Sequence, residues 1–206
     1  MKLAVAWVAL ATLVFACLCV KEMPTAANPG GEMNLEGKRI AMIIAHEGFR
    51  DEEFEKPYEI FTSGGASVEI VSTDLSEATG MLGKKVKPTM LIDNLSVDQF
   101  DAVVFVGGAG SQVYFDDARA LSIAREANEK NKVVAAICIA PVILANAGVL
   151  EGRRATVWDG EFIEKLESKG AIYTGNDVER DGNVITANGP HAAERFAAEI
   201  ARALTE

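Results

Sequence analysis

The stretch Val133-Val134-Ala135-Ala136-Ile137-Cys138-Ile139-Ala140-Pro141 decides the fold class of this chain. Its first five residues are all apolar, which is typical of a strand buried on both faces of a parallel sheet. A helix-like segment, 142–147, follows the proline. A strand that turns at once into a helix places the turn residue, here Cys138, on the rim of the sheet, as in the nucleophile elbow of hydrolases. The alternative is that Cys138 is a small buried apolar residue, as free cysteines often are.

Strand-like and helix-like segments alternate on both sides of this stretch. The apolar patterns predict strands at 39–45, 66–72, 102–106, 155–158 and 171–173, and helices at 52–63, 117–131 and 190–204. Asp181-Gly182 predicts a hairpin turn between strands at 178–181 and 183–186. Residues 81–94 indicate two short strands or an irregular excursion. Such alternation predicts an α/β fold, with a mostly parallel sheet sandwiched between helices.

Composition and missing motifs narrow the function. The 206 residues include 30 acidic and 20 basic ones, and this net charge of −10 argues against a nucleic-acid partner. Neither a dinucleotide-binding G-x-G-x-x-G after the first strand nor a phosphate-binding Walker loop occurs. Two distant histidines and one cysteine in the body make no zinc site. We therefore expect no metal and no cofactor.

The amino-terminal segment differs from the rest of the chain. An apolar run, 3–20, lies between Lys2 and Lys21, so residues 1–22 predict an export signal or a membrane anchor. Residues 23–36 indicate a flexible linker, and 37–206 the folded domain. Val14-Phe15-Ala16-Cys17 also resembles a lipobox, which makes Cys17 a candidate for lipidation. Cleavage, lipidation and retention as an anchor stay open, and each predicts an exported domain: membrane-anchored, periplasmic or extracellular.

Cys138 is the only cysteine outside this leader, because Cys17 and Cys19 belong to it. An exported domain with one cysteine has no internal disulfide framework, so its thiol is either tolerated or used. Backbone amides at the start of a helix favour thiolate over thiol. The sequence therefore predicts a lowered pKa for Cys138.

Four motifs in this order resemble the DJ-1/PfpI superfamily over about residues 38–204. They are Gly48-Phe49-Arg50-Asp51-Glu52-Glu53-Phe54 with Pro57, Asp101-Ala102-Val103-Val104-Phe105-Val106-Gly107-Gly108, Ala136-Ile137-Cys138-Ile139-Ala140-Pro141, and Asp181-Gly182-Asn183-Val184-Ile185-Thr186 before Gly189-Pro190. The resemblance implies a flavodoxin-like fold and a homodimer or higher homo-oligomer. It also implies that Cys138 is the nucleophile, Glu53 its carboxylic-acid partner, and Gly108 an oxyanion-binding amide, to which the amide at Ile139 adds a second donor. Without the resemblance, Glu53 reads as a solvated glutamate at a helix start.

The chain departs from protease-type members at the positions that carry their acid–base residues. Ile139 stands where those members have a histidine, Arg50 where they have a second acidic residue, and Trp158 where some relatives have a histidine near the cleft. The Cys–His pair of a cysteine peptidase is thus absent. His46 directly follows the first strand and is a candidate pocket residue, with an exposed loop histidine as the alternative. Trp158 suits a pocket for a small apolar or planar ligand.

Three functions follow from these residues. The first is a glyoxalase- or deglycase-type enzyme in which Cys138 attacks a small carbonyl substrate and forms a hemithioacetal, with Glu53 relaying protons. The second is a redox-sensing or protective protein in which Cys138 is oxidised to sulfinic acid beside Glu53. The third is a silent interaction domain that keeps only the fold. A peptidase ranks below these because Ile139 removes the adjacent base.

Overall fold

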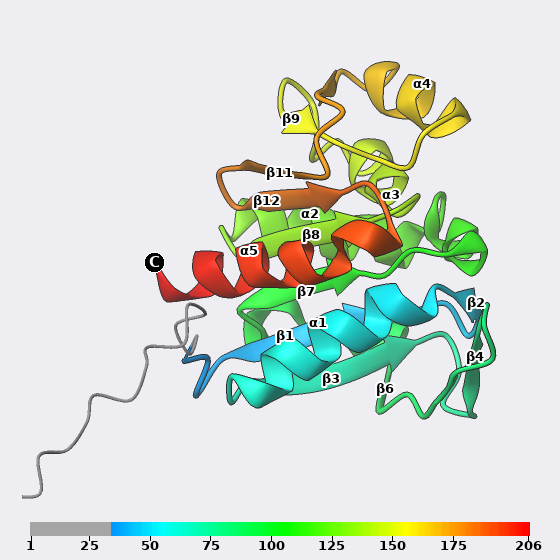
Figure 1. Cartoon of the computed structure of the whole chain (residues 1–206), viewed down its shortest axis with the longest axis vertical. Coiled ribbons are helices and arrows are strands. Elements are labelled where there is room, and N and C mark those ends of the chain that lie inside the picture. Colours follow the sequence, from blue (N-terminus) through cyan, green and yellow to red (C-terminus); the bar gives the residue numbers. More distant parts are fainter. Residues whose placement is uncertain (1–33) are drawn as a thin grey trace, which may run out of the picture. The chain divides into compact units, whose positions relative to one another are not determined.

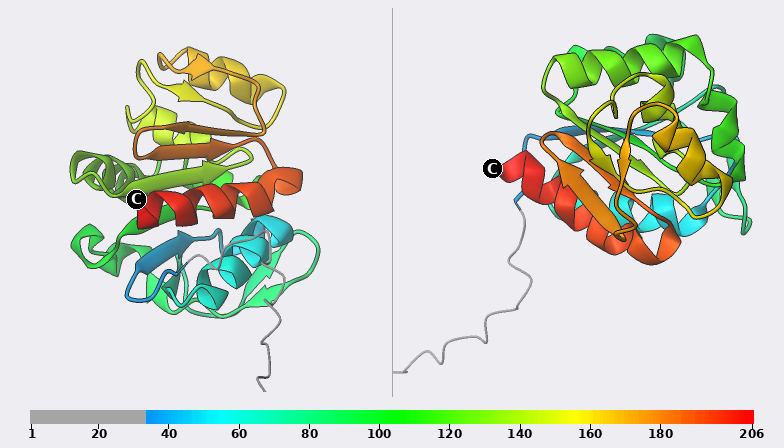
Figure 2. Two further views of the ribbon diagram at one scale, coloured as in Figure 1. Left: turned by 60° about the vertical axis from the view of Figure 1, so that its left-hand side comes forward. Right: turned by 90° about the horizontal axis from the view of Figure 1, so that it is seen from above.

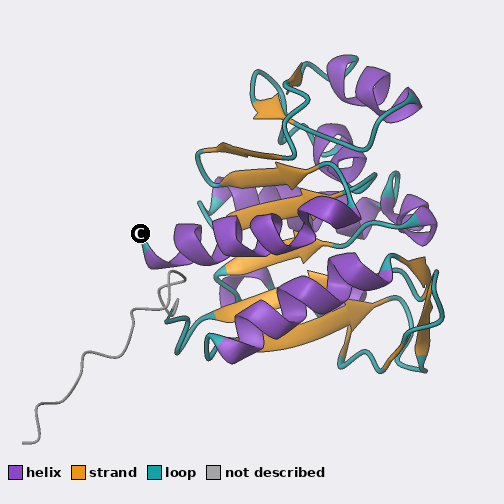
Figure 3. Cartoon of the chain, viewed as in Figure 1, coloured by secondary structure: helices purple, strands orange, loops and turns teal. Residues whose placement is uncertain are grey.

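The computed structural model describes residues 34–206, and the predicted leader, with Cys17 and Cys19, lies outside the described residues. Figure 3 shows the helices, strands and loops of the described part. Within it, none of the helices combines the length and the apolar character that crossing a bilayer requires. Leu35 is fully buried, and its N–H donates to the carbonyl of Gly64 at 2.7 Å. The packed structure therefore includes Leu35, which the sequence had assigned to the linker.

A seven-stranded sheet of order β11-β12-β8-β7-β1-β3-β6 forms the centre of the fold (Figure 1). The strands are β1 (Arg39–Ile43), β3 (Ser67–Ser72), β6 (Met90–Leu91), β7 (Ala102–Phe105), β8 (Val133–Ile137), β11 (Val178–Asp181) and β12 (Val184–Ala187). Neighbouring strands are parallel except for β11, which pairs antiparallel to β12 in the predicted hairpin. The mostly parallel α/β sheet is thus confirmed.

The register of the sheet brings three strand ends together. Phe105 near the end of β7 pairs with Ile43 at the end of β1 and with Ala136 near the end of β8. All five residues of β8 are buried, as a strand covered on both faces requires. Ligands bind beyond the carboxyl ends of such strands, so this edge is where a site is expected.

Helices cover both faces of the sheet (Figures 1 and 2). α1 (Asp51–Ser63) and α5 (Ala193–Thr205) lie together on one face, and α2 (Ala118–Glu129) and α3 (Pro141–Asn146) lie on the other. α5 packs an apolar stripe against the sheet, in which Phe196, Ile200 and Ala201 are fully buried. Short 3₁₀ helices complete the chain: η1 (Ile92–Asn94), η2 (Val97–Gln99), η3 (Ala109–Tyr114) and η4 (Pro190–Ala192).

Two small sheets differ from the expected pattern. β9 (Arg154–Ala155) and β10 (Ile172–Tyr173) pair only with each other, so the strands predicted at 155–158 and 171–173 are shorter and do not join the central sheet. α4 (Glu161–Glu167) lies between them in the chain and was not predicted, since of its seven residues only Leu166 is buried. The second small sheet contains β2 (Glu47–Phe49), β4 (Ala78–Gly80) and β5 (Lys85–Val86).

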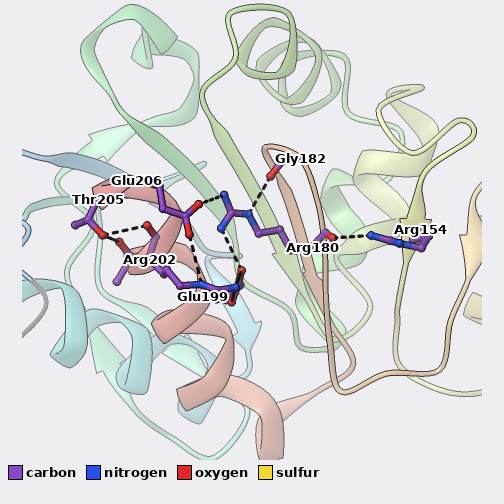
Figure 4. A network of polar contacts seen from close by, with 8 residues as sticks. Arg154, Arg180, Gly182, Glu199, Arg202, Thr205 and Glu206 are labelled. Carbon is purple, nitrogen blue, oxygen red and sulfur yellow. Dashed lines mark hydrogen bonds and ion pairs between the residues drawn. The ribbon is translucent and has the colours of Figure 1, made fainter. Parts of the chain in front are cut away.

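An ion-pair network ties the edge strand β11 to the carboxyl-terminal helix (Figure 4). Arg180 pairs with Glu199 at 3.3 Å and with Glu206 at 2.7 Å, and Arg202 reaches Glu199 at 2.7 Å. Such surface pairs contribute at most about 1 kcal/mol each. A hollow of about 700 Å³ runs along this network, but its arginines are already paired with carboxylates. It therefore offers no free cation to a ligand.

Candidate active site around Cys138

Cys138 sits in a sharp turn between β8 and α3. Its φ of +64° lies in the left-handed region, which a residue with a side chain seldom adopts and which costs roughly 1–2 kcal/mol. Two backbone hydrogen bonds hold the turn: the N–H of Cys138 donates to Ala187 O at 2.9 Å, and the N–H of Trp158 donates to Cys138 O at 2.8 Å. Backbone strain at a single residue, maintained by the surrounding structure, is a feature of functional sites.

Few amides of α3 are free to face the sulfur. Pro141 has no N–H, and those of Ala140 and Val142 already donate to Ile137 O and Ile139 O. The N–H groups that act on the thiol of Cys138 belong to Gly108 and Ile139, and both lower its pKa. Gly108 adopts φ +97°, and a Cβ there would collide with the backbone at Arg50, Gly48 and Phe49. Glycine is therefore required for this amide to reach the sulfur.

Glu53 reaches the same place from the first turn of α1. Its side chain is fully buried, and neither carboxyl oxygen has a well-aligned hydrogen-bond partner within residues 34–206. A Cβ at Gly107 would lie 2.5 Å from both Glu53 Oε2 and Cys138 Cβ. The end of β7, the start of α1 and the elbow therefore meet where only a glycine fits between them. Glu53 is not the solvated helix-start glutamate that local sequence alone suggests.

The protonation of Glu53 governs the Cys138 thiol. Burial raises the pKa of Glu53 to about 8, against opposing effects of Cys138, Arg50 and the Gly107 amide. With this pKa the carboxyl keeps its proton at pH 7. Burial also raises the pKa of Cys138, and the charge of an ionised Glu53 raises it further, to about 12. A neutral Glu53 removes that repulsion, so the two groups titrate as one coupled pair.

The lowered thiol pKa expected from the helix start is therefore not observed. The expectation counted the amides of α3 and omitted the burial of the sulfur, which is the largest influence on its pKa. It also overestimated the helix, because α3 has six residues and a proline at its start. What favours the thiolate here is the two amides of Gly108 and Ile139, whereas an ionised Glu53 opposes it.

Cys138 and Glu53 open into a pocket of about 310 Å³. Its lining comprises Arg50, Glu53, Met81, Gly108, Ala109, Gln112, Cys138, Ile139, Trp158, Phe162 and Pro190. Five candidate residues from the sequence thus meet in one place: Cys138, Glu53, Gly108, Ile139 and Trp158. No pattern in the sequence indicated Met81 and Phe162, which come from a connecting turn and from the unpredicted helix α4.

His46, the sixth candidate, does not line this pocket. Its Nε2 lies 3.4 Å from Ser76 Oγ and 3.9 Å from a carboxyl oxygen of Glu47. The chain leaves the end of β1 and enters β2, which carries this ring away from Cys138. The nearby charged residue that does face the pocket is Arg50, whose guanidinium is held by Glu52 through contacts of 2.7 and 3.0 Å.

Asp51 holds the backbone turn that forms one wall of the pocket. It is nearly fully buried, and its carboxylate accepts the N–H groups of Leu82 and Lys84, both at 2.8 Å. These bonds hold the turn that presents Met81, and Met81 Sδ in turn accepts the N–H of Ala109 at 3.4 Å. Asp51 thus fixes a turn that is distant in sequence and adjacent to the site.

We expect Asp51→Ala to lower the free energy of unfolding by about 1–3 kcal/mol for each amide left without an acceptor. Asp74→Ala is the matched control, because Asp74 accepts a similar turn N–H, that of Ser76, but is exposed. Urea unfolding of both variants measures the difference. Equal small losses would show that the buried carboxylate does not hold the turn.

Comparison with known proteins agrees with this geometry. The family model described as the DJ-1/PfpI family matches residues 38–203. The chain belongs to the DJ-1/PfpI family. The match covers both β8 with its elbow and the first turn of α1, so it includes every residue of the Cys138–Glu53 pair.

Members of the DJ-1/PfpI family resemble this chain over most of its length. Uncharacterized protein MJ0967 of Methanocaldococcus jannaschii is 40% identical over 205 residues, which is 98% of this chain and 97% of that protein. Deglycase PfpI of Pyrococcus furiosus is 34% identical over 152 residues, 74% of this chain and 90% of that protein. The solved structure of a ThiJ/PfpI domain protein from Brachyspira murdochii superposes with a TM-score of 0.79 at 33% identity, covering 82% of this chain and 98% of that one.

Proposed function

We propose that this chain is a cysteine-dependent enzyme that converts reactive 2-oxoaldehydes, or their adducts on amines, into 2-hydroxy acids without a cofactor. The observation that carries the proposal is the fully buried Glu53, its pKa raised by that burial, beside Cys138 in the lining of one pocket. The deglycase name of the relative from Pyrococcus furiosus supports the same substrate class.

The chemistry starts once the coupled pair has lost one of its two protons, because the carboxylate of Glu53 then takes the thiol proton and Cys138 attacks as a thiolate. Sγ attacks the aldehyde carbon, and the electrons of the C=O bond move to oxygen, where the amides of Gly108 and Ile139 stabilise them. Glu53 then gives its proton to this oxygen, which completes the hemithioacetal and leaves a carboxylate.

Glu53 next acts as a base. Its carboxylate takes the proton from C1, a proton passes between the two substrate oxygens, and Glu53 returns its proton to C2. The product is a 2-hydroxyacyl thioester on Cys138. One water molecule cleaves this thioester, releases the hydroxy acid and restores the sulfur, so one water is consumed for each oxoaldehyde and no redox partner is needed.

Lactate formation from methylglyoxal, followed by NMR with the purified full chain, tests the proposal. Stoichiometric conversion without added thiol or metal supports it. Consumption of methylglyoxal without lactate overturns it. Selective sulfinate formation at Cys138 under two equivalents of peroxide, with no turnover, also overturns it and favours the redox function, since Cys138 is the free cysteine of residues 34–206.

A further inference from the structure

The pocket above Cys138 is apolar over most of its wall. Six of the residues that line it carry apolar side chains: Met81, Ala109, Ile139, Trp158, Phe162 and Pro190. Among residues 34–206 the only lining cation is Arg50, and Glu52 already engages it through two hydrogen bonds. A charged substituent would therefore lose its hydration without gaining a free partner.

Neighbouring groups hold the aromatic part of this wall in place. The ring of Phe162 packs edge-on to Phe115, with centroids 6.4 Å apart, and Lys165 Nζ lies 5.0 Å from its centroid. The backbone N–H of Trp158 donates to Cys138 O, and the Trp158 ring, 43% exposed, lies against Gly189. A Cβ at Gly189 would lie 2.6 Å from two atoms of the Trp158 ring. Rings fixed in this way bind a ligand with little further loss of conformational entropy.

Met81 forms the remaining wall of the pocket; its side chain adapts its shape, while its backbone is held in place. Met81 is 47% exposed and is set over the pocket by the turn that Asp51 holds. A thioether adapts its shape to different apolar groups and makes favourable contacts with aromatic rings. Met81, Trp158 and Phe162 thus form an apolar chamber next to the reactive pair.

We propose that the preferred substrates are neutral 2-oxoaldehydes with a bulky apolar or aromatic substituent, which occupies this chamber while the aldehyde meets Cys138. The proposal rests on the reaction proposed above. A volume of about 310 Å³ is within the range of pockets that bury drug-sized ligands, roughly 300–1,000 Å³. Methylglyoxal, with three carbons, leaves most of this apolar surface uncovered.

The test compares phenylglyoxal with methylglyoxal on the full chain, with the background of Cys138→Ala subtracted to remove reaction with arginines. We expect kcat/KM to be at least about tenfold higher for phenylglyoxal. Phe162→Ala and Met81→Ala are each expected to reduce that preference at least about threefold. Ile172→Ala is the matched control, because Ile172 is an exposed apolar residue that does not line the pocket.

A binding arm separates this proposal from the reaction itself. Acetophenone and acetone carry the same two substituents without the aldehyde, and the fluorescence of Trp158 reports their binding once the Trp158→Phe signal, which contains Trp7, is subtracted. Equal turnover of both oxoaldehydes overturns the substrate preference and leaves the reaction standing. If there is no turnover, but acetophenone binds more tightly than acetone and Phe162→Ala weakens the binding of acetophenone, the reaction is overturned and the chamber is supported. If the protein shows neither turnover nor binding, both the reaction and the substrate preference are overturned.

Discussion

Replacing Cys138 by alanine is expected to lower kcat/KM for a 2-oxoaldehyde at least about 10³-fold, because Cys138 is the only thiol, hydroxyl or amine side chain that lines the pocket among residues 34–206. Cys138 lies at the base of the pocket, with the amides of Gly108 and Ile139 beside its sulfur. Without sulfur the pocket keeps its apolar wall, so substrate binding is expected to persist while the chemical step is lost. Steady-state kinetics and acetophenone binding measure the two effects separately.

Two controls make this result specific. Cys138→Ser keeps an oxygen nucleophile of similar size, and its residual turnover is expected to lie far below that of the wild type, since a serine here has no histidine to activate it. Circular dichroism and thermal unfolding check that both variants keep the fold. Turnover by Cys138→Ala within tenfold of the wild type would show that Cys138 is not the nucleophile.

The sequence was sufficient for the fold because its strongest signals are uninterrupted apolar segments. Residues 133–137, 102–106 and 40–45 are such segments, and each contains a central strand of the sheet. β9 and β10 have two residues each, too few for any periodicity to identify their partners. Helix α4 was not predicted for a similar reason, because it buries a single side chain.

The site shows a different limit of sequence reasoning. The order of the motifs predicted that Cys138, Glu53 and Gly108 share one site, and in the structure all three line the same pocket. Burial decides their chemistry, however, and burial is a property of the whole fold: Glu53 follows two acidic residues in the sequence yet is the fully enclosed one. The direction of the Cys138 pKa shift depends mainly on the burial of its sulfur, so the position at a helix start alone predicted a shift of the wrong sign.

Replacing Glu53 by glutamine is expected to change how stability depends on pH. Burial raises the pKa of Glu53 to about 8 from an ordinary value of 4.5. Between these two pH values the folded chain keeps a proton that the unfolded chain releases, so the stability from this proton is complete below pH 4.5 and is lost as pH rises through 8. Glutamine stays neutral throughout and removes that loss, on the order of 4 kcal/mol at high pH.

Urea unfolding at pH 5, 7 and 9 measures the effect. The wild type is expected to lose stability over this range, and Glu53→Gln to lose much less. Glu52→Gln and Glu55→Gln are the matched controls from the same helix turns, because these two carboxylates pair with Arg50 and Lys84 near the surface. Both should follow the wild-type curve. Four parallel curves would show that Glu53 ionises as an ordinary surface carboxylate.

The same variant separates the two roles of Glu53 at the sulfur. Above pH 8 the ionised Glu53 of the wild type repels a thiolate, whereas glutamine does not, so Cys138 of Glu53→Gln is expected to react faster with iodoacetamide there, as followed by mass spectrometry of the Cys138 peptide. Turnover should move in the opposite direction, falling at least about 10²-fold, because glutamine cannot carry a proton from C1 to C2. A thiol that becomes more reactive while the enzyme becomes slower is the signature of a proton relay. If both rates fell together, Glu53 would merely support the geometry of the elbow.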